Sequence, residues 1–355
     1  MMKVLIAMSG GVDSSVAAKL LCDEGCECIG CTMKLYDNCD AGLPRGRTCC
    51  SLDDVEDARS VAFSLGMRYY VFNFKDDFRE KVIKKFASGY LRGQTPNPCI
   101  DCNRYMKFDK LLERAKLLGC DKLATGHYAR IEFDGEKYRL KKALDKSKDQ
   151  SYVLYMLTQE QLAHTLFPLG SLHKTDTRAI ADAADLSSAR KPDSQDICFV
   201  PDGDYAAAIE RLTGEKAPCG DFIDASGKIL GTHRGITHYT VGQHRGLGLS
   251  LPERRYVCGI DAESGTVTLG GSDELYSSTA EVHGFNWISG ETPAEPIRCT
   301  AKIRYRQPEQ PATAIAHKGG SITIQFDSPQ RAVTPGQAAV LYDGDTVLGG
   351  GEIVR

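Results

Sequence analysis

The sequence lacks any long apolar run. No stretch of its 355 residues approaches the ~18 consecutive apolar residues of a transmembrane helix, and the first run, Val4 to Met8, ends at polar Ser9. It also lacks an excess of charge of one sign, since 44 Lys and Arg face 47 Asp and Glu and leave a formal net charge of −3. These absences predict a cytoplasmic protein with no membrane partner and exclude a uniformly basic nucleic-acid coat. An RNA partner would need a local basic patch.

Internal repeats and low-complexity segments are absent as well. Hydrophobic residues make up 42% and charged residues 26% of the chain, which is typical of a folded globular protein rather than a disordered one. At this length the chain exceeds one ordinary hydrophobic core, so we expect two or three domains.

Cysteine, by contrast, is abundant, with 14 residues. In a reducing compartment these are expected to be buried thiols, metal ligands or catalytic groups rather than structural disulfides. A strand through Cys28 and Cys31 would point them to opposite faces, so we interpret the nearby set as core thiols: Cys22, Cys26, Cys28 and Cys31. Cys39, Cys49 and Cys50 fall in a Gly/Pro/Arg-rich loop, where a metal or redox role is an open alternative that no spacing pattern supports.

The stretch Ser9-Gly10-Gly11-Val12-Asp13-Ser14-Ser15 joins a predicted buried strand to a predicted helix. Two glycines let the backbone approach a ligand, and a helix N-terminus presents N–H groups to anions, so a phosphate or pyrophosphate is the expected occupant. The loop lacks the Gly-Lys-Ser/Thr ending of a Walker A motif. The competing interpretation is an ordinary strand-to-helix turn with a serine cap.

Short apolar strands alternate with helical patterns in the first half of the chain. The predicted strands are Val4–Met8, Cys28–Met33, Tyr69–Phe74 and Lys122–Thr125, and the predicted helices lie near 53–65, 77–91 and 106–118. This alternation predicts an α/β fold, a doubly wound parallel sheet that binds ligands at the carboxyl ends of its strands. Both Ser9–Ser15 and Thr125-Gly126-His127 fall at such ends.

The second half changes character. From about Asp202 the helical signal fades and glycine rises, which predicts a small mixed middle domain. After about Ser272 short alternating strands predict a C-terminal antiparallel β-barrel: 281–288, 298–306, 312–317, 321–326 and 338–343. The expected domains are therefore 1–201, 202–272 and 273–355.

Two thiols follow a stiff Pro-x-Pro segment in Thr95-Pro96-Asn97-Pro98-Cys99-Ile100-Asp101-Cys102. We expect them just before the helix from Met106 to Leu118, where a helix N-terminus favours thiolate. A third candidate, Cys198, lies in another polar stretch. The alternatives are helix-start residues with no role, or zinc ligands, although no second C-x-x-C supplies four of them.

A local basic face is predicted in 298–306. Strand periodicity places Arg298, Lys302, Arg304 and Arg306 on one side and apolar residues on the other. Such a face suits phosphate contacts, although a merely solvated strand face has the same pattern. His127 is equally ambiguous, because a histidine after a strand is often only a satisfied polar group.

Several separated motifs together carry a family resemblance. They are Ser9-Gly10-Gly11-Val12-Asp13-Ser14, Thr95-Pro96-Asn97-Pro98, Cys102-Asn103, Ala124-Thr125-Gly126-His127-Tyr128, Lys148-Asp149-Gln150-Ser151-Tyr152, Ile197-Cys198-Phe199, Arg304-Tyr305-Arg306 and Thr334-Pro335-Gly336-Gln337. With these the chain closely resembles, nearly end to end, the tRNA-specific 2-thiouridylases, a pyrophosphatase-loop family of ATP-dependent tRNA thiolation enzymes.

The resemblance implies ATP- and Mg²⁺-dependent adenylation of the C2 carbonyl oxygen of the tRNA wobble uridine. Sulfur then arrives as a protein persulfide, supplied by a sulfur-relay protein or a cysteine desulfurase. It implies Cys102 as nucleophile and Cys198 as persulfide carrier, able to form a disulfide. The implied ATP contacts are Ala7, Met8, Ser9, Gly10, Gly11, Val12, Asp13, Ser14, Met33 and Gly126. The implied tRNA contacts are Asn97, Pro98 and Cys99 at the target base, and His127, Lys148, Asp149, Gln150, Arg304, Tyr305 and Gln337.

One position departs from the family pattern. Better-known members carry an aspartate, proposed as a general acid or base, where this chain has Cys99, and Asp101 would point a different way from the same turn. A second mechanism therefore stands beside the persulfide route, in which Cys99, Cys102 and Cys198 hold a [4Fe-4S] cluster that binds hydrosulfide.

Two further functions stay open. An amide-forming pyrophosphatase-loop ligase would use the same loop with an amine as acceptor, and it would need no paired cysteines. A non-catalytic RNA-binding protein would bind tRNA without turning over ATP, although the intact Ser9–Ser15 loop speaks against it.

Overall fold

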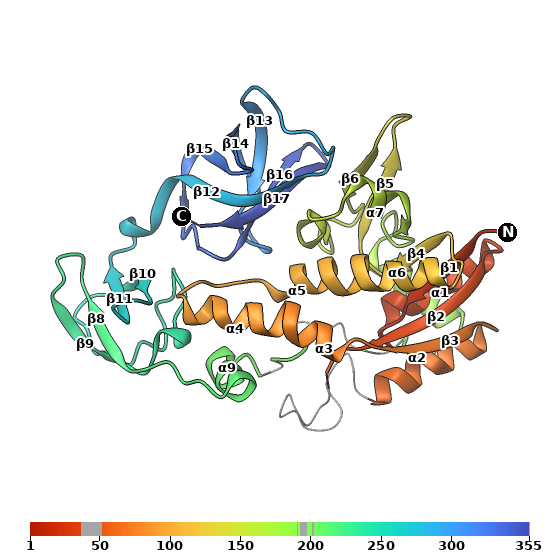
Figure 1. Cartoon of the computed structure of the whole chain (residues 1–355), viewed down its shortest axis with the longest axis horizontal. Helices are drawn as coiled ribbons and strands as arrows, with labels where there is room; N and C mark the ends of the chain where they lie inside the picture. Colours follow the sequence, from red (N-terminus) through yellow and green to blue (C-terminus); the bar gives the residue numbers. More distant parts are fainter. Residues whose placement is uncertain (37–51, 190, 192–196, 201, 355) are drawn as a thin grey trace.

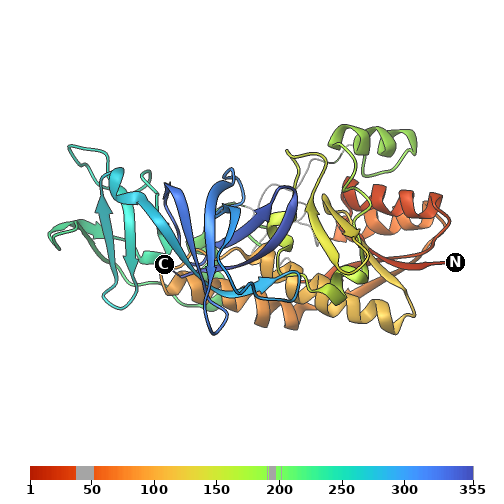
Figure 2. The same cartoon turned by 90° about the horizontal axis from the view of Figure 1, so that it is seen from above.

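The computed structural model describes residues 1–36, 52–189, 191, 197–200 and 202–354. An N-terminal α/β domain, a small middle sheet and a C-terminal barrel are arranged around a central row of helices, and Figure 1 shows the barrel above this row and the middle sheet at its far end from the N-terminus. Seen from above, in Figure 2, the molecule is elongated along the same direction. Within the described residues, no helix is both long and apolar enough to cross a membrane.

The N-terminal domain is built on a five-stranded sheet with the strand order β3-β2-β1-β4-β7, in which neighbouring strands pair in parallel. Its strands are β1 (Lys3–Ala7), β2 (Glu27–Lys34), β3 (Arg68–Asn73), β4 (Lys122–Thr125) and β7 (Thr165–Leu166). The first four were predicted within one residue at each end. The expected α/β fold with a parallel sheet is confirmed.

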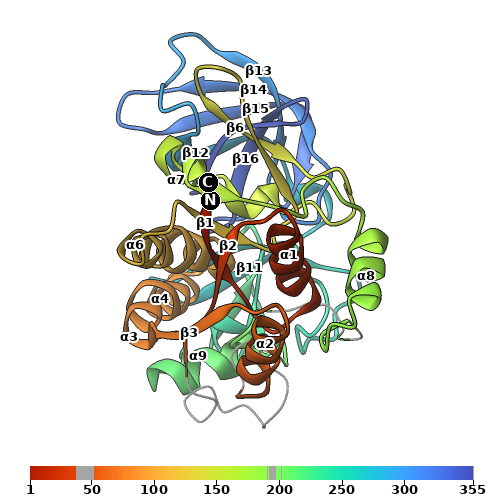
Figure 3. The ribbon, with the colours of Figure 1, turned by 90° about the vertical axis from the view of Figure 1, so that its right-hand side faces the viewer.

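Alternate residues of the central strand β1 point into two separate cores. Leu5 packs with the aromatic cluster of Phe78, Phe86 and Phe108, whereas Val4 and Ile6 pack in the other core. Helices α1 (Val12–Asp23), α2 (Leu52–Ser64) and α8 (Lys174–Ala183) cover the second face, and Figure 3 shows them on the opposite side from α3, α4 and α6. Helices thus cover both faces of the sheet.

The other face carries two interrupted helices. The first consists of α3 (Lys75–Phe78), a π-helical turn (Arg79–Ile83) and α4 (Lys84–Leu91), over the range predicted as one amphipathic helix. The second runs through α5 (Pro98–Asp101), a π-helical stretch (Cys102–Leu111) and α6 (Leu112–Leu117). Its predicted apolar stripe is buried, since Phe108 and Leu111 are both 0% exposed.

One strand differs from its predicted environment. Tyr69–Phe74 was expected to be buried, but β3 is the edge of the sheet and Tyr70 and Val71 are 38% and 43% exposed. An apolar run alone does not distinguish a central strand from an edge strand, because the difference depends on what the chain places beside it.

The middle domain is a four-stranded sheet in the order β10-β11-β8-β9. It comprises β8 (Gly220–Ile223), β9 (Ile229–His233), β10 (Tyr256–Asp261) and β11 (Thr266–Gly270), and α9 (Tyr205–Thr213) precedes it. Its own core gathers Phe222, Tyr239, Val257 and Leu269. The glycine-rich segment 234–249 between β9 and β10 is largely loop.

The C-terminal domain is a closed antiparallel barrel of β12-β15-β14-β13-β16-β17, closed by pairing of β12 with β17. Its strands are β12 (Tyr276–Trp287), β13 (Ile297–Lys302), β14 (Gln310–Ala316), β15 (Ile322–Arg331), β16 (Ala338–Asp343) and β17 (Thr346–Ile353). The predicted barrel is therefore confirmed, with β17 as an additional strand beyond the five predicted ranges.

The predicted basic face on 298–306 is wrong in its second half. Strand β13 ends at Lys302, the chain then turns, and the alternation that would have placed Arg304 beside Arg298 is lost. The Arg304 guanidinium turns inward, where Nη2 donates to the Val241 and Ala332 carbonyls and to Thr334 Oγ1 at 3.0, 3.2 and 2.6 Å. Arg298 stays exposed and pairs with Asp327 at 2.7 Å.

A hairpin of the N-terminal domain joins the barrel. β5 (Ala129–Phe133) and β6 (Tyr138–Lys142) extend the barrel sheet, because Thr346 of β17 pairs with Lys141. The short helix α7 (Gln159–Ala163) packs beneath, and Gln159 Nε2 donates to the Ile288 carbonyl at 2.8 Å. Val340 and Tyr342 of β16 belong to the same buried cluster as Phe78 and Phe108, so one core spans both domains.

Candidate functional site

The loop Ser9–Ser15 follows β1 at the carboxyl edge of the sheet. Gly10 has a φ of +74°, and a Cβ there would lie 2.4 Å from the Asp54 carbonyl oxygen, so only glycine fits this approach. Helix α1 begins at Val12, and its N-cap residue Gly11 offers no side-chain cap. The first amides of α1 therefore remain available to an anion, as a phosphate-binding helix N-terminus requires.

The loop is braced from within. Ser9 N donates to Ser14 Oγ at 3.2 Å, while the Ser14 and Ser15 hydroxyls each donate to the Gly11 carbonyl at 3.0 Å. Ser188, from a distant segment, donates to Ser15 Oγ at 2.9 Å. These bonds fix the loop before any ligand enters.

Asp13 is held on one side by groups that the sequence did not reveal. Lys174 Nζ at the start of α8 lies 2.6 Å from Asp13 Oδ1, and the Tyr128 hydroxyl lies 2.9 Å from the same oxygen. Lys174 is 9% exposed. No local pattern around Lys174 indicates a partner 161 residues away, so sequence reasoning missed it.

A second lysine braces the glycines. Lys191 Nζ lies 3.3 Å from the Gly10 carbonyl and pairs with Asp54 and Asp57 at 2.6 and 2.5 Å. Burial opposes its charge, but hydrogen bonds to the two carboxylates outweigh burial and raise the pKa of Lys191. Lys191 was also not predicted.

Three more of the implied ATP contacts lie at the same edge of the sheet. Ala7, Met33 and Gly126 stand at or just beyond the carboxyl ends of β1, β2 and β4, which are neighbours in the sheet. A Cβ on Gly126 would lie 2.8 Å from Asp13 C and Ser14 N, so this glycine lets the two loops touch. Met8 and Val12 are each only 3% exposed, so their side chains belong to the core.

The segment with two thiols begins a helix earlier than predicted. Asn97 Oδ1 accepts from Cys99 N at 3.1 Å, and Pro98 takes the first helical position, so the helix starts at Pro98 rather than near Met106. An Asn cap followed by proline is a recognised start signal. Cys99 therefore lies exposed in the first turn and Cys102 lies half-buried in the next.

Asp101 points away from Cys99, as expected. It is 4% exposed and pairs with Lys85 of α4 at 2.9 Å. Burial raises the pKa of Asp101, partly countered by the Lys85 ammonium.

Cys198, although distant from Cys102 in the sequence, packs against the core that contains Phe78 and Phe86. Its carbonyl accepts from the Tyr36 hydroxyl at 2.8 Å, and Phe199 packs edge-on against Phe78 and Phe86. Cys102 and Cys198 both pack, half-buried, against one aromatic cluster. The segments that carry the two predicted thiols therefore pack against one common core.

The implied tRNA contacts divide into inward and outward groups. His127 is 7% exposed, its Nδ1 lies 2.6 Å from Thr125 Oγ1, and Lys107 Nζ lies 3.4 Å from its Nε2. Burial, reinforced by the Lys107 charge, holds the pKa of His127 well below its ordinary value. These contacts agree with the alternative interpretation of His127 as a satisfied polar group, and its implied contact with tRNA stays a prediction.

The segment 148–150 lies between the hairpin and the barrel. Asp149 accepts from Ala143 N and from the Ser151 hydroxyl at 2.9 and 2.7 Å, and Gln150 Oε1 accepts from Tyr128 N at 2.9 Å. Lys148 is half-buried. Tyr305 is 39% exposed, and its hydroxyl lies 3.5 Å from the Asp149 carbonyl, so these two implied contact regions adjoin.

Gln337 makes a contact that the sequence did not predict. Its Nε2 donates to the Thr95 carbonyl at 2.5 Å, and Thr95 N donates to the Pro335 carbonyl at 2.8 Å. A Cβ on neighbouring Gly336 would lie 2.8 Å from Thr95 N. The barrel loop that contains Pro335, Gly336 and Gln337 therefore contacts the start of the Pro-x-Pro segment, which precedes the thiols in the sequence.

The remaining cysteines are mostly structural. Cys28 and Cys31 are buried in opposite cores, as predicted from their strand, whereas Cys22 and Cys26 are only half-buried. Cys39, Cys49 and Cys50 lie outside the described residues. Among the described residues, no group of three or more His, Cys, Asp or Glu side chains is arranged to hold a metal ion.

Three protein families match successive parts of the chain. They are described as "tRNA methyl transferase HUP domain" over residues 2–202, "tRNA methyl transferase PRC-barrel domain" over 208–271 and "Aminomethyltransferase beta-barrel domain" over 277–353. Among solved structures, an NMN synthetase from Francisella tularensis is 16% identical with a TM-score of 0.35, covering 61% of this chain and 78% of its own. That likeness is too weak to carry an argument.

Full-length relatives are much closer. The chain is 52% identical to the tRNA-specific 2-thiouridylase MnmA of Acetivibrio thermocellus, over 99% of each chain. It is 51% identical to MnmA 2 of Caldanaerobacter subterraneus subsp. tengcongensis, over 99% of this chain and 98% of the relative. With identity at this level across nearly the whole length and matching domains in the same order, the chain belongs to the tRNA-specific 2-thiouridylase family.

Proposed function

We propose that this chain uses ATP to replace the C2 oxygen of the tRNA wobble uridine with sulfur, as a cytoplasmic tRNA sulfurtransferase. The observation that carries the proposal is the pairing of an uncapped phosphate loop with two half-buried thiols on one core. Family membership narrows the acceptor to tRNA. We assign the ATP-dependent chemistry to 1–201 and tRNA contacts to 202–272 and 273–355.

The first step makes a poor electrophile reactive. The uridine C2 carbonyl oxygen attacks the α-phosphorus of ATP, the α–β anhydride bond breaks and pyrophosphate leaves, while the base gives up its N3 proton. The oxygen becomes part of an adenylate and therefore a good leaving group. Backbone amides of Gly11 to Ser14 and the α1 dipole would hold the phosphates.

Mg²⁺ would accompany ATP and neutralise phosphate charge. The site offers hard oxygen donors, namely the Asp13 carboxylate and the Ser9 and Ser14 hydroxyls, which is the ligand type that this ion prefers. Asp13 Oδ1 is already engaged by Lys174, so Asp13 also orients this lysine toward the loop.

The second step transfers sulfur. The terminal sulfur of a Cys198 persulfide attacks C2, and the C2–O bond breaks as AMP leaves. The Cys102 thiolate then attacks Cys198 Sγ, which breaks the S–S bond, leaves the sulfur on uridine and forms a Cys102–Cys198 disulfide. The same disulfide results if Cys102 first releases hydrosulfide, which then attacks C2.

Two external partners complete the cycle. A cysteine desulfurase or a sulfur-relay protein must supply persulfide to Cys198, and a dithiol reductant must reopen the disulfide. Cys99, exposed in the first turn of α5, would lie with Asn97 and Pro98 beside the target base.

The [4Fe-4S] variant would need Cys99, Cys102 and Cys198 to converge. In the part of the chain that the structure describes, no three such side chains are gathered to bind metal, and Cys99 is exposed, so this arrangement does not fit a cluster. We derive no step through one. Iron analysis after anaerobic purification of wild type and Cys99→Ala tests this choice: stoichiometric iron that Cys99→Ala loses together with activity would overturn the persulfide route.

The decisive experiment separates the two steps. Cys102→Ser and Cys198→Ser should each abolish 2-thiouridine formation, measured by nucleoside mass spectrometry, yet retain tRNA-dependent release of pyrophosphate. Cys219→Ser, at an exposed cysteine of the middle domain, is the matched control and should keep both activities.

Each contrary outcome names another function. Pyrophosphate release without 2-thiouridine formation in the wild type, unchanged in both serine variants, would favour an amide-forming ligase. Binding of tRNA without ATP cleavage in the wild type would favour a non-catalytic RNA-binding protein. In cells, deletion of the gene should remove 2-thiouridine from tRNA, and its persistence, in a genome with one copy, would refute the proposal.

A further inference from the structure

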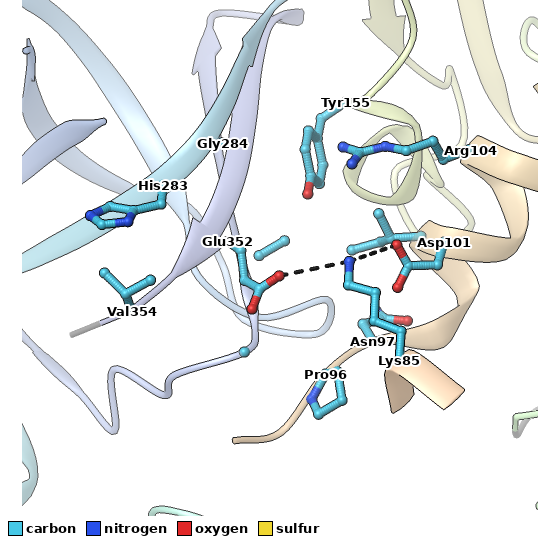
Figure 4. Close-up of a pocket in the computed structure, with 13 residues that line it drawn as sticks. Lys85, Pro96, Asn97, Asp101, Arg104, Tyr155, His283, Gly284, Glu352 and Val354 are labelled. Carbon is cyan, nitrogen blue, oxygen red and sulfur yellow. Dashed lines mark hydrogen bonds and ion pairs between the residues drawn. The ribbon is translucent and has the colours of Figure 1, made fainter. Parts of the chain in front are cut away.

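A cavity of about 260 Å³ lies between the helices of the N-terminal domain and the barrel. Its polar lining comes from α4, from α5 and the π-helical stretch, and from β12 and β17, and includes Lys85, Asn97, Asp101, Arg104, Tyr155 and Glu352. Figure 4 shows these side chains converging from both domains. Cys99, Cys102 and Cys198 do not line the cavity, whereas Asn97, assigned above to the target base, does, so the cavity adjoins the target-base site.

Tyr155 is a preformed donor in this cavity. It is 4% exposed and lines the cavity. The ring is packed tightly, because a Cβ on Gly350 would lie 2.6 Å from Tyr155 Cγ, and Asn286 Nδ2 holds the Tyr155 carbonyl at 2.8 Å. Burial raises the pKa of Tyr155 to about 12, so the hydroxyl keeps its proton at neutral pH.

Arg104 supplies a second cation beside Lys85. Lys85 Nζ lies 2.9 Å from Asp101 and 3.8 Å from Glu352, and so serves both carboxylates. Arg104, half-buried nearby, lies 5.9 Å from the Tyr105 ring, and its charge opposes the rise in the pKa of Asp101 and of Tyr155. In Figure 4 its guanidinium points toward Tyr155.

The lining therefore presents donors and acceptors together. Two carboxylates disfavour a bare phosphate, whereas the edge of a nucleobase offers ring or carbonyl acceptors to Arg and Tyr and amino or imino donors to carboxylates. Asn97, Asp101 and Arg104 follow helical spacing along one side of the helix that carries Cys99 and Cys102 on another. When the target uridine lies at the thiols, a neighbouring nucleotide of the same RNA can reach this cavity.

We propose that the cavity binds an unpaired nucleobase of the substrate RNA other than the target uridine. The Tyr155 hydroxyl and the Arg104 guanidinium donate to its acceptor atoms, and Asp101 and Glu352 accept from its amino or imino groups. This inference rests on the proposed function, because it takes the RNA to be bound with its target at the thiols.

A cycle of protein and RNA changes tests the inference. Tyr155→Phe and Arg104→Gln are each assayed by single-turnover thiolation of tRNA transcripts that lack one base at a time in the anticodon loop. On the intact transcript, each variant should lower the rate at subsaturating RNA about fivefold, the effect of roughly one hydrogen bond. Tyr276→Phe, at a tyrosine 50% exposed on the barrel, should have no effect.

The informative quantity is the coupling between the two changes. For one abasic position, the loss should already be present in the wild type, and Tyr155→Phe and Arg104→Gln should add nothing further. The pyrophosphate-release KM for ATP should stay unchanged in both. If every abasic position combines additively with both variants, the cavity binds no base and the inference is overturned, while wild-type thiolation still supports the proposed function.

Folding is controlled separately. Glu352→Gln alters the barrel side of the cavity without touching α5, and it should show the same lack of additivity at the same abasic position. A wild type that does not thiolate tRNA at all would instead overturn the proposed function.

Discussion

The ammonium of Lys174 lies 2.6 Å from Asp13 Oδ1, and this contact ties the first residue of α8 to the phosphate loop across 161 positions of sequence. Tyr128 approaches the same carboxylate at 2.9 Å and also lies 2.9 Å from Thr177 Oγ1. Helix α8 therefore closes one side of the loop, and Lys174 is placed to stabilise negative charge that develops there.

Replacement of Lys174 by Gln should weaken ATP use. The change removes a largely buried cation and leaves the Asp13 carboxylate with less charge compensation. Because Asp13 is one-third exposed, we expect a loss of about 1–2 kcal/mol, which is roughly a five- to thirtyfold rise in the KM for ATP. Pyrophosphate release at varied ATP measures it. Lys19→Gln removes the exposed Lys19–Asp23 pair of α1 and should leave this KM unchanged; equal effects of both variants would contradict the assignment.

Gly126 should tolerate no side chain. A Cβ there would lie 2.8 Å from Asp13 C and Ser14 N, both backbone atoms, so Gly126→Ala must displace the phosphate loop. We expect a destabilisation of about 1–3 kcal/mol together with a large loss of ATP affinity. Urea unfolding and ATP titration measure the two effects. Gly271→Ala, which meets only a flexible Glu274 carboxylate at 3.8 Å, should change neither.

The hydrogen bond from Gln337 to Thr95 should affect the kinetics with tRNA more than the KM for ATP. Gln337→Ala removes the amide donor at 2.5 Å from the Thr95 carbonyl and loosens the segment that sets Asn97 and Cys99. Loss of roughly one hydrogen bond, about 1 kcal/mol, predicts about a fivefold lower kcat/KM for tRNA. Gln325→Ala on the exposed face of β15 is the control. An altered KM for ATP with unaltered tRNA kinetics would argue against this positioning role.

His127 should make the protein less stable in mild acid. Because burial lowers its pKa in the folded state, the unfolded chain binds the proton first. The associated stability is complete above the ordinary histidine pKa and is lost as the pH falls below about 6.5, with a slope of up to about 1.4 kcal/mol per pH unit. Burial also lowers the pKa of His233 and His238, so they add to the total in the same direction.

The measurement is the free energy of unfolding between pH 7.5 and 5. His127→Gln should flatten this dependence, whereas substitution of the exposed His317 should not. Parallel pH profiles for wild type and His127→Gln would show that the histidine does not titrate with folding.

Much of the fold follows from local pattern. The strands at Lys3–Ala7 and Lys122–Thr125 are short apolar runs beside glycine turns, and such runs in alternation with helices have few other solutions. The barrel also follows, because period-2 alternation persists through most of its strands. The phosphate loop is local as well, so its place at a strand end was predictable.

The predictions failed where long-range packing determines the position of a side chain or the exposure of a strand. Nothing within 298–306 shows that the chain turns after Lys302 and that Arg304 bonds to Val241 and Ala332 carbonyls. Tyr70 is exposed because β3 is an edge strand, which is a property of the sheet. Lys174 and Tyr155 contact partners more than a hundred residues away in the sequence, which no local pattern indicates.

The single aromatic core that runs from Phe78 to Tyr342 has a consequence for how the molecule comes apart. Cooperative unfolding follows shared cores rather than sequence segments, so the N-terminal domain and the barrel should protect their amides from hydrogen exchange as one unit. The middle sheet, with its own cluster around Phe222 and Val257, should open separately and first. The chain therefore has three structural domains but is expected to unfold as two cooperative units.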